Sequence, residues 1–346
     1  MRRLPIFFVL DVSESMIGTQ LTQLEEGMSR IVASLRKDPS ALETVHISVI
    51  AFAGKSKVIS PLIDVVSFYP PRLPIGGGTS LGSALDVLMN EIDKKVVKQT
   101  STVQGDWKPI VFLITDGQPT DNSSKAIEKW NEEYASKATI VAITLGNGAD
   151  TGILKKLTPN VLIYEGSTDD EFRKFVDWIS NSVKMQSQKA DAGKGSEGID
   201  LTKVSDELSF AETGQAPLTD PNTVVLTGRC KTKKSPYLIK YSRMGTLQSL
   251  ERYTDEIQYN LEGCFPITED YFNWSSENDI NEIDASSLIG VPGCPHCGNR
   301  VAFAVCGHCE KIMCIDGQGK AICPWCNEEN NFVPGDGDFN VQRGQG

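Results

Sequence analysis

The chain has 346 residues, and 40% of them are hydrophobic, so it is long enough for two domains with buried cores and a linker. Its formal net charge of −11 argues against a general binder of nucleic acid or of anionic membranes. No apolar run approaches the roughly 20 residues that a helix needs to span a bilayer, so we expect no membrane insertion.

The apolar run at the start of the chain predicts a buried strand over Leu4–Leu10 rather than an export signal. Two arginines precede the run, as in a signal peptide. However, the run is short, Asp11 ends it, and no small-residue cleavage site follows. We therefore expect Arg2 and Arg3 to lie in solvent at the start of the strand.

Strand and helix patterns alternate from residue 1 to about residue 188. Short runs rich in Val, Ile and Phe predict further buried strands over Val45–Phe52, Ile110–Thr115, Thr139–Leu145 and Val161–Tyr164. Apolar residues at helical spacing predict helices over residues 21–35, 81–96 and about 169–184. This alternation predicts an α/β domain with a doubly wound, mostly parallel sheet, whose ligand site lies beyond the carboxyl ends of the strands.

Three polar motifs stand where that rule places a ligand. LDVSES follows the first strand and offers Asp11, Ser13 and Ser15. GGGTS offers Thr79 just before a long helix, and ITDGQPTD offers Asp116 after the third predicted strand. Hard divalent cations prefer such oxygen ligands, and only two of the five carry charge. The ion would keep an open position for a carboxylate from another molecule, which predicts binding rather than catalysis. The alternative is a domain of this fold whose site is unused.

This constellation resembles the von Willebrand factor type A domain and its metal-ion-dependent adhesion site, over roughly residues 4–185. The resemblance implies Mg²⁺ or Mn²⁺, with Ser13, Ser15 and Thr79 near the ion and with Asp11 and Asp116 acting partly through water.

Three polar residues outside these motifs are expected to have structural roles. We expect Asp121 to cap the helix that begins near Ser123, Asp86 to lie on a helix surface, and His46 to lie within a strand without binding metal.

The segment after this domain changes in character. Residues 189–215 are predicted as a linker, since the stretch QSQKADAGKGSEG over residues 186–198 is polar, contains glycine and lacks periodicity. Residues 216–334 are predicted as a second, small β-rich domain, with strands over TVVLTGRC, PYLIKYSR and YNLEGCFPI. Residues 335–346 are predicted as a disordered tail.

The cysteines predict zinc. Seven of the nine lie between Cys294 and Cys326, and clustered C-x-x-C pairs in a long chain without an export signal predict metal ligands in a cytoplasmic protein. The pairs Cys294/Cys297 and Cys323/Cys326 have the form C-P-x-C and are predicted to hold one structural zinc between them.

The other cysteines leave the number of zinc ions at one or two. Cys306, His308, Cys309 and Cys314 can form a second site, with Cys230 or Cys264 contributing. A cross-braced arrangement of all eight consecutive ligands is an alternative, although the adjacency of His308 and Cys309 fits the usual ubiquitin-ligase ring spacing poorly. Some of these thiols can instead be buried in the ribbon without metal.

The whole chain resembles the bacterial TerY family of tellurite-resistance and stress-response systems. The phrases TGRCKTKKSPYLIKYSR and CPHCG…AVC…CPWC carry the C-terminal part of this resemblance. It implies a non-enzymatic scaffold whose protein partners are a protein kinase and a metal-dependent protein phosphatase.

Two other functions compete with this expectation. A metal-dependent hydrolase using Asp11 and Asp116 is one, but no histidine lies near those motifs and no G-x-S-x-G or phosphate-binding loop occurs. A zinc-ribbon factor associated with nucleic acid is the other, and the acidic charge argues against it.

Overall fold

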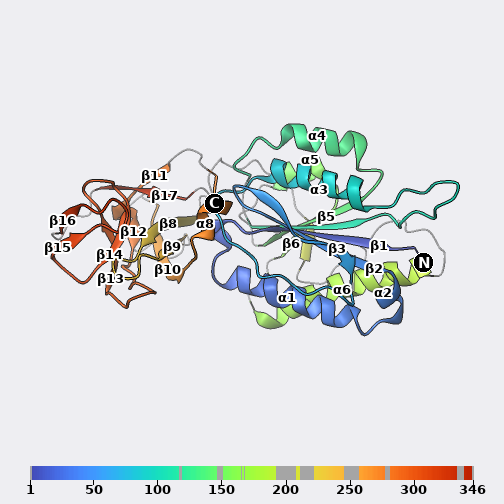
Figure 1. Cartoon of the computed structure of the whole chain (residues 1–346), viewed down its shortest axis with the longest axis horizontal. Coiled ribbons are helices and arrows are strands. Elements are labelled where there is room, and N and C mark those ends of the chain that lie inside the picture. Colours follow the sequence, from blue (N-terminus) through green and yellow to red (C-terminus); the bar gives the residue numbers. More distant parts are fainter. Residues whose placement is uncertain are drawn as a thin grey trace.

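The computed structural model describes residues 2–116, 119–145, 151–164, 166, 168–191, 208–210, 222–244, 257–276, 281–332 and 339–344. Two domains lie end to end along the long axis of the molecule (Figure 1). The N-terminus lies at the far end of the first domain, and the second domain lies at the opposite end. No helix in these ranges combines the length and apolar composition that crossing a bilayer requires.

The first domain is a sheet covered by helices on both faces. Among the described residues, seven strands form this sheet in the order β3-β2-β1-β4-β5-β6-β7. The inner strands run parallel, and the edge strands β3 and β7 are antiparallel to their neighbours. The strands are β1 (Leu4–Asp11), β2 (Val45–Phe52), β3 (Ser56–Asp64), β4 (Ile110–Thr115), β5 (Thr139–Leu145), β6 (Val161–Tyr164) and β7 (Leu208–Phe210).

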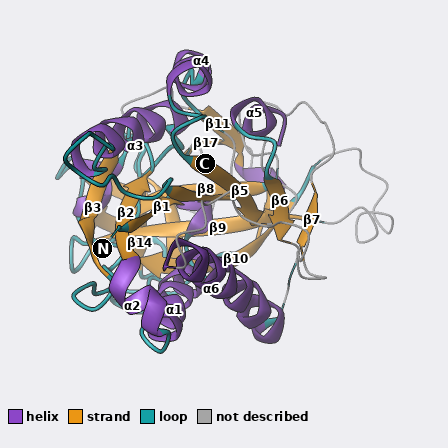
Figure 2. Cartoon of the chain, turned by 90° about the vertical axis from the view of Figure 1, so that its right-hand side faces the viewer, coloured by secondary structure: helices purple, strands orange, loops and turns teal. Residues whose placement is uncertain are grey.

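Successive side chains of a strand point to opposite faces of the sheet, and each face has its own hydrophobic core. Leu4, Ile6 and Phe8 of β1 face one core, whereas Phe7 and Val9 face the other. Helices on one side of the sheet contribute to the first core, namely α1 (Thr19–Leu35), α2 (Pro39–Thr44) and α6 (Asp169–Asp191). The other side carries α3 (Leu81–Lys95), α4 (Ser124–Glu133) and α5 (Thr151–Leu157), as Figure 2 shows. Because both faces are covered, the inner strands are continuously apolar, and their predicted positions are confirmed.

Strand β3, helix α6, strand β7 and the C-terminal tail differ from the prediction. Strand β3 was missed because its residues are mixed polar and apolar, and it contains Pro61, which only an edge strand tolerates well. Helix α6 continues to Asp191, and β7 adds to the first sheet from within the segment predicted as a linker. Strand β17 (Asn340–Arg343) pairs with β11 (Asn281–Asp284) from within the predicted disordered tail, which corrects that prediction for these residues.

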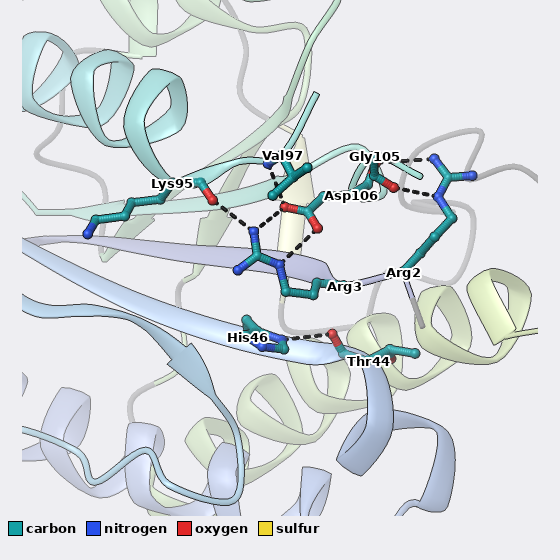
Figure 3. Close-up of polar contacts among 8 residues, drawn as sticks. All are labelled: Arg2, Arg3, Thr44, His46, Lys95, Val97, Gly105 and Asp106. Carbon is teal, nitrogen blue, oxygen red and sulfur yellow. Dashed lines mark hydrogen bonds and ion pairs between the residues drawn. The ribbon is translucent and has the colours of Figure 1, made fainter. Parts of the chain in front are cut away.

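The arginine pair before β1 is not simply solvated. The Arg3 guanidinium makes two hydrogen bonds to the Asp106 carboxylate, of 2.9 and 2.6 Å, and another to the Lys95 carbonyl (Figure 3). The Val97 N–H also donates to Asp106, at 2.8 Å. The neighbouring Arg2 donates to Gly105 O. These bonds fasten the segment between α3 and β4 to the start of β1, far from the carboxyl ends of the strands.

The second domain is built on a twisted antiparallel core. In the described part of the chain, six strands form its main sheet in the order β12-β10-β9-β8-β14-β13. Strands β8, β9 and β10 are antiparallel, and β14 joins β8 in parallel. The strands are β8 (Thr223–Arg229), β9 (Pro236–Arg243), β10 (Tyr259–Pro266), β12 (Leu288–Ile289), β13 (Val301–Val305) and β14 (Ile312–Ile315). A hairpin of β15 (Gly319–Ile322) and β16 (Glu329–Phe332) follows, and the short helix α8 (Asp270–Trp274) lies at the junction with the first domain (Figure 1).

Candidate metal centres

The first candidate site lies at the carboxyl ends of β1 and β4, which are neighbours in the sheet. The Ser13 N–H donates to Asp11 Oδ1 at 2.9 Å, which folds the D-x-S-x-S loop back on itself. Ser13 Oγ and Ser15 Oγ lie 3.0 Å apart, and Ser15 Oγ donates to Asp116 Oδ1 at 2.9 Å. Hydrogen bonds thus bring four of the five predicted ligands into one buried cluster, because β1 and β4 end side by side at the switch in strand order.

Thr79 reaches the same region through a separate loop. Gly76 N–H donates to Val12 O at 3.0 Å, and Thr79 N–H donates to Thr120 Oγ1 at 2.9 Å, so this loop is tied to both of the others. The Thr79 hydroxyl is buried, with 1% of the residue exposed, and Thr79 Oγ1 has no hydrogen-bond partner among the described residues. An unmet buried oxygen costs about 1–3 kcal/mol. A divalent cation would meet it, so the residues fit a metal.

The buried charges of the site also favour a bound metal cation. Asp11 is fully buried, and this burial raises its pKa to about 6, against the hydrogen bonds from Thr115 and Ser13 that lower it. Asp116 is 8% exposed and lies within the same cluster. Two buried carboxylates destabilise each other unless a positive charge is shared between them. A divalent cation held by these oxygens would supply that charge and act as a Lewis acid toward an incoming carboxylate.

Asp121 has a different role from the one predicted. Its carboxylate accepts from the N–H groups of Gly82 and Ser83, both at 3.2 Å, so it caps α3 rather than α4. The loop after β4 is thereby fastened to the helix that follows Thr79, which holds Asp116 and Thr79 in register.

The cysteines form two groups whose membership differs from the prediction. In the described residues, one group consists of Cys230, Cys294, Cys297 and Cys314, and the other of Cys306, Cys309, Cys323 and Cys326. The pairs Cys294/Cys297 and Cys323/Cys326 therefore belong to different groups, which corrects the predicted single site. His308 is in neither group, and its backbone N–H donates to Cys306 Sγ at 3.5 Å.

The sulfur spacing tests whether zinc fits. A tetrahedral zinc ion with bonds of about 2.3 Å places its sulfurs about 3.8 Å apart. The Cys297–Cys314 and Cys306–Cys326 sulfurs lie 3.7 Å apart, and within each group all four sulfurs lie within 4.8 Å of one another. All nine cysteines are free thiols rather than disulfides. Both groups therefore fit a closed, structural four-thiolate site.

The same turn is built four times around these ligands. At Cys230, Cys294, Cys306 and Cys323, the cysteine N–H donates to the carbonyl five residues later, and its carbonyl accepts from the N–H four residues later. The residue at that fourth position has a positive φ each time: Lys234 (57°), Gly298 (77°), Glu310 (58°) and Asn327 (63°). Cys230 begins such a turn although Lys233 stands where the other three have their second cysteine, which is why the spacing of cysteines alone did not reveal it.

Cys264 lies outside both groups among the described residues. Burial raises the pKa of its thiol to about 12, so it stays protonated and packs beside the Cys230 group.

Two family models match the chain, one over each domain. The model of the von Willebrand factor type A domain matches residues 6–178. The chain belongs to this family. The model described as the TerY-C metal binding domain matches residues 220–346, so the chain has the two-domain architecture of TerY proteins that the resemblance implied.

Individual relatives of this von Willebrand factor type A protein are distant. Human inter-alpha-trypsin inhibitor heavy chain H2 is 27% identical over 167 residues, which cover 44% of this chain and 16% of that protein. A von Willebrand factor type A structure from Catenulispora acidiphila has a TM-score of 0.41 and 13% identity, covering 80% of this chain and 69% of that one. Proximal thread matrix protein 1 from the mussel byssus, described with a zinc-occupied adhesion motif, has a TM-score of 0.38 and 20% identity, covering 54% and 46%.

The TerY-C domain docks directly onto the loops that carry the adhesion motif. Trp274 of α8 is 8% exposed and packs in a cluster with Val12, Ala51 and Ala53 of the first domain. Gly76 must be a glycine here, because a Cβ at this position would lie 2.5 Å from the Trp274 Cβ. The absence of a side chain at Gly76 therefore lets the second domain pack against the loop that carries Thr79.

A buried polar contact joins the two domains within the D-x-S-x-S loop itself. The Tyr271 hydroxyl donates to Oε1 of Glu14, the residue between Ser13 and Ser15. Burial and the Glu14 charge raise the pKa of Tyr271 well above its usual range, so the hydroxyl remains a donor. Neither residue belongs to a recognisable motif, so the sequence did not indicate this contact.

Proposed function

We propose that this protein is a non-enzymatic scaffold that binds a partner protein by coordinating a partner carboxylate through Mg²⁺ or Mn²⁺ at the adhesion motif. The supporting observation is the buried Thr79 hydroxyl, which lacks a hydrogen-bond partner in the described chain beside two buried aspartates. Oxygens arranged in this way suit a hard cation, and with two charges among five ligands the cation keeps affinity for a further anion.

The TerY-C domain contributes two structural zinc sites in this proposal. Closed sets of four thiolates would leave no ligand position for catalysis, and they would hold together a domain whose apolar clusters are smaller than those of the first domain. The TerY architecture supports a role in tellurite resistance or a related stress response in the cytoplasm. The partners we propose are a protein kinase and a metal-dependent protein phosphatase.

Capture of purified candidate kinase and phosphatase tests the proposal. The protein is first dialysed into metal-free buffer that leaves zinc bound, and capture is measured before and after Mg²⁺ is restored. We expect Mg²⁺ to restore capture by the wild-type chain but not by Asp11→Ala. Asp86→Ala is the matched control, because Asp86 is an exposed aspartate on α3.

Two results would oppose the proposal. Capture by Asp11→Ala that equals wild-type capture, with and without Mg²⁺, would show that the adhesion motif is not the binding site. Metal-dependent turnover of ester or phosphoester substrates that disappears in Asp11→Ala would favour a hydrolase instead.

A further inference from the structure

A cleft of about 580 Å³ lies between the two domains, next to the adhesion motif. Asp116 and Gln20 line it from the first domain, and Asn222, Lys240 and Glu262 line it from the second. Its volume lies in the range of about 300–1,000 Å³ that is usual for ligand pockets. An anion that approaches the cation from the Asp116 side therefore meets side chains of the TerY-C domain as well.

The ammonium group of Lys240 is the part of this cleft that is suited to bind an anionic ligand. It lies on β9 and is 7% exposed, yet its ammonium group has two partners: Ile17 O at 3.3 Å and Glu262 Oε2 at 3.2 Å. An ammonium group carries three N–H donors, and leaving a buried one unmet is costly. In the described part of the chain, one donor of Lys240 is therefore available to a ligand in the cleft.

The position of Lys240 couples it to the metal loops. Its partner Ile17 follows Ser15, a predicted metal ligand, by two residues, so the ammonium group is fixed relative to the adhesion motif. Its other partner, Glu262, has a side chain that is 42% exposed and also accepts a hydrogen bond from Ser242 Oγ, so this carboxylate keeps a partner when a competing anion replaces it at Lys240.

The charges in the cleft favour a ligand with two acidic groups. A divalent cation would balance Asp11 and Asp116, and Lys240 balances Glu262. With the cation bound the cleft is neutral, whereas the chain as a whole carries −11. The net negative charge of the chain repels an acidic segment, which would meet two cationic groups here.

We propose that the two domains together bind one acidic segment of a partner protein. One carboxylate of the segment binds the cation at the adhesion motif, and a second carboxylate nearby in the same segment replaces Glu262 as the partner of Lys240. This inference rests on the proposed function and adds to it a specificity-determining residue that belongs to the TerY-C domain.

An array of fluorescein-labelled pentapeptides tests the inference. Each peptide has a central aspartate or glutamate, and the flanking positions are varied through all residues. Binding is measured by anisotropy in Mn²⁺, with metal-free buffer as the reference. For the wild-type chain we expect metal-dependent binding that is strongest when a flanking residue is also acidic.

Variants assign that preference to Lys240. In Lys240→Met, the affinity ratio of two-acid to one-acid peptides should fall by about fivefold, the effect of one partly exposed ion pair. Lys240→Arg should keep most of the preference. Lys320→Met, which removes an exposed lysine paired with Glu329 in the hairpin of β15 and β16, is the matched control and should leave the ratio unchanged. Zinc content and circular dichroism verify that each variant is folded.

Glu262→Gln should change the affinity for two-acid peptides in the opposite direction. It removes the internal carboxylate that competes for Lys240, so two-acid peptides should bind more tightly, and the gain should vanish when Lys240→Met is added. Metal-dependent binding with a two-acid preference that Lys240→Met does not change would overturn the inference alone. Absence of any metal-dependent binding by the wild-type chain would overturn the proposed function as well.

Discussion

Replacing Trp274 with alanine should separate the two domains without unfolding either of them. The indole belongs to α8 of the TerY-C domain, but its apolar neighbours Val12, Ala51 and Ala53 belong to the first domain. The truncation therefore removes burial between the domains rather than burial within one core.

The magnitude follows from the area that the indole buries. A buried tryptophan covers roughly 150–250 Å². At about 25 cal/mol per Å² this area contributes roughly 4–6 kcal/mol. Measured Trp→Ala substitutions cost about 3–5 kcal/mol, so we expect the docking free energy to fall by about 4 kcal/mol. A loss of that size shifts the docking equilibrium by about a thousandfold.

Amide hydrogen exchange read by mass spectrometry measures this shift. Among the described residues, two backbone hydrogen bonds cross between the domains: Lys55 N–H donates to Trp274 O at 3.0 Å, and Ser276 N–H donates to Gly77 O at 3.1 Å. Because undocking exposes both amides, peptides that contain them should exchange up to about a thousandfold faster in Trp274→Ala. Peptides from β4, in the centre of the first sheet, should exchange at the wild-type rate.

A variant on the same helix is the control for an effect on the helix itself. Phe272 also lies on α8, but its ring packs against Tyr271 and Trp325 of its own domain. Phe272→Ala should leave the exchange of Lys55 unchanged. Wild-type protection of Lys55 and Ser276 in Trp274→Ala would show that the indole does not hold the domains together, and the reasoning from buried area would be refuted.

Three further predictions concern the metal sites, the domain contact and the far end of the first domain. Cys230→Ser should lower the zinc content measured by elemental analysis from two ions per chain to one, whereas Cys264→Ser should retain both; equal zinc in the two variants would contradict the thiolate grouping. Gly76→Ala should speed exchange at Lys55 as Trp274→Ala does, since its Cβ would lie 2.5 Å from the Trp274 Cβ, and wild-type exchange would show that the loop yields instead. Arg3→Ala should lower the free energy of unfolding of the first domain, measured by urea denaturation, by about 2 kcal/mol, because Asp106 is 4% exposed and loses its charged donor; a change within error would mean that water replaces the guanidinium.

Much of the first domain was predictable because its signals are local. Strands covered on both faces must be apolar along their whole length, and this pattern identified Val45–Phe52 and Ile110–Thr115 without error at either end. The D-x-S-x-S loop is likewise local, since Asp11, Ser13 and Ser15 are held together by bonds between residues two apart. Edge strands such as β3 lack this continuous pattern, and they were missed.

The partition of the thiolates was decided by strand pairing. The C-x-x-C spacing indicates that the two sulfurs of one pair bind the same metal. It does not indicate which other cysteines complete the site. Strand β14 lies parallel to β8, with Met313 opposite Arg229, the last residue of β8, and the residues that follow these two are Cys314 and Cys230. That register brings Cys314 and Cys230 together, although neither belongs to a C-x-x-C pair. The spacing of cysteines along the chain does not indicate this contact.

The docking of the TerY-C domain beside the adhesion motif was also decided by tertiary structure alone. The sequence by itself determined which oxygens gather at the ends of β1 and β4, because each follows a recognisable strand. It did not determine what lies over them, because Trp274, Tyr271 and Lys240 have no motif and act through contacts with residues more than 200 positions away. Local periodicity reports secondary structure, whereas a contact between two folded surfaces depends on their shape and charge, which exist only once both domains have folded.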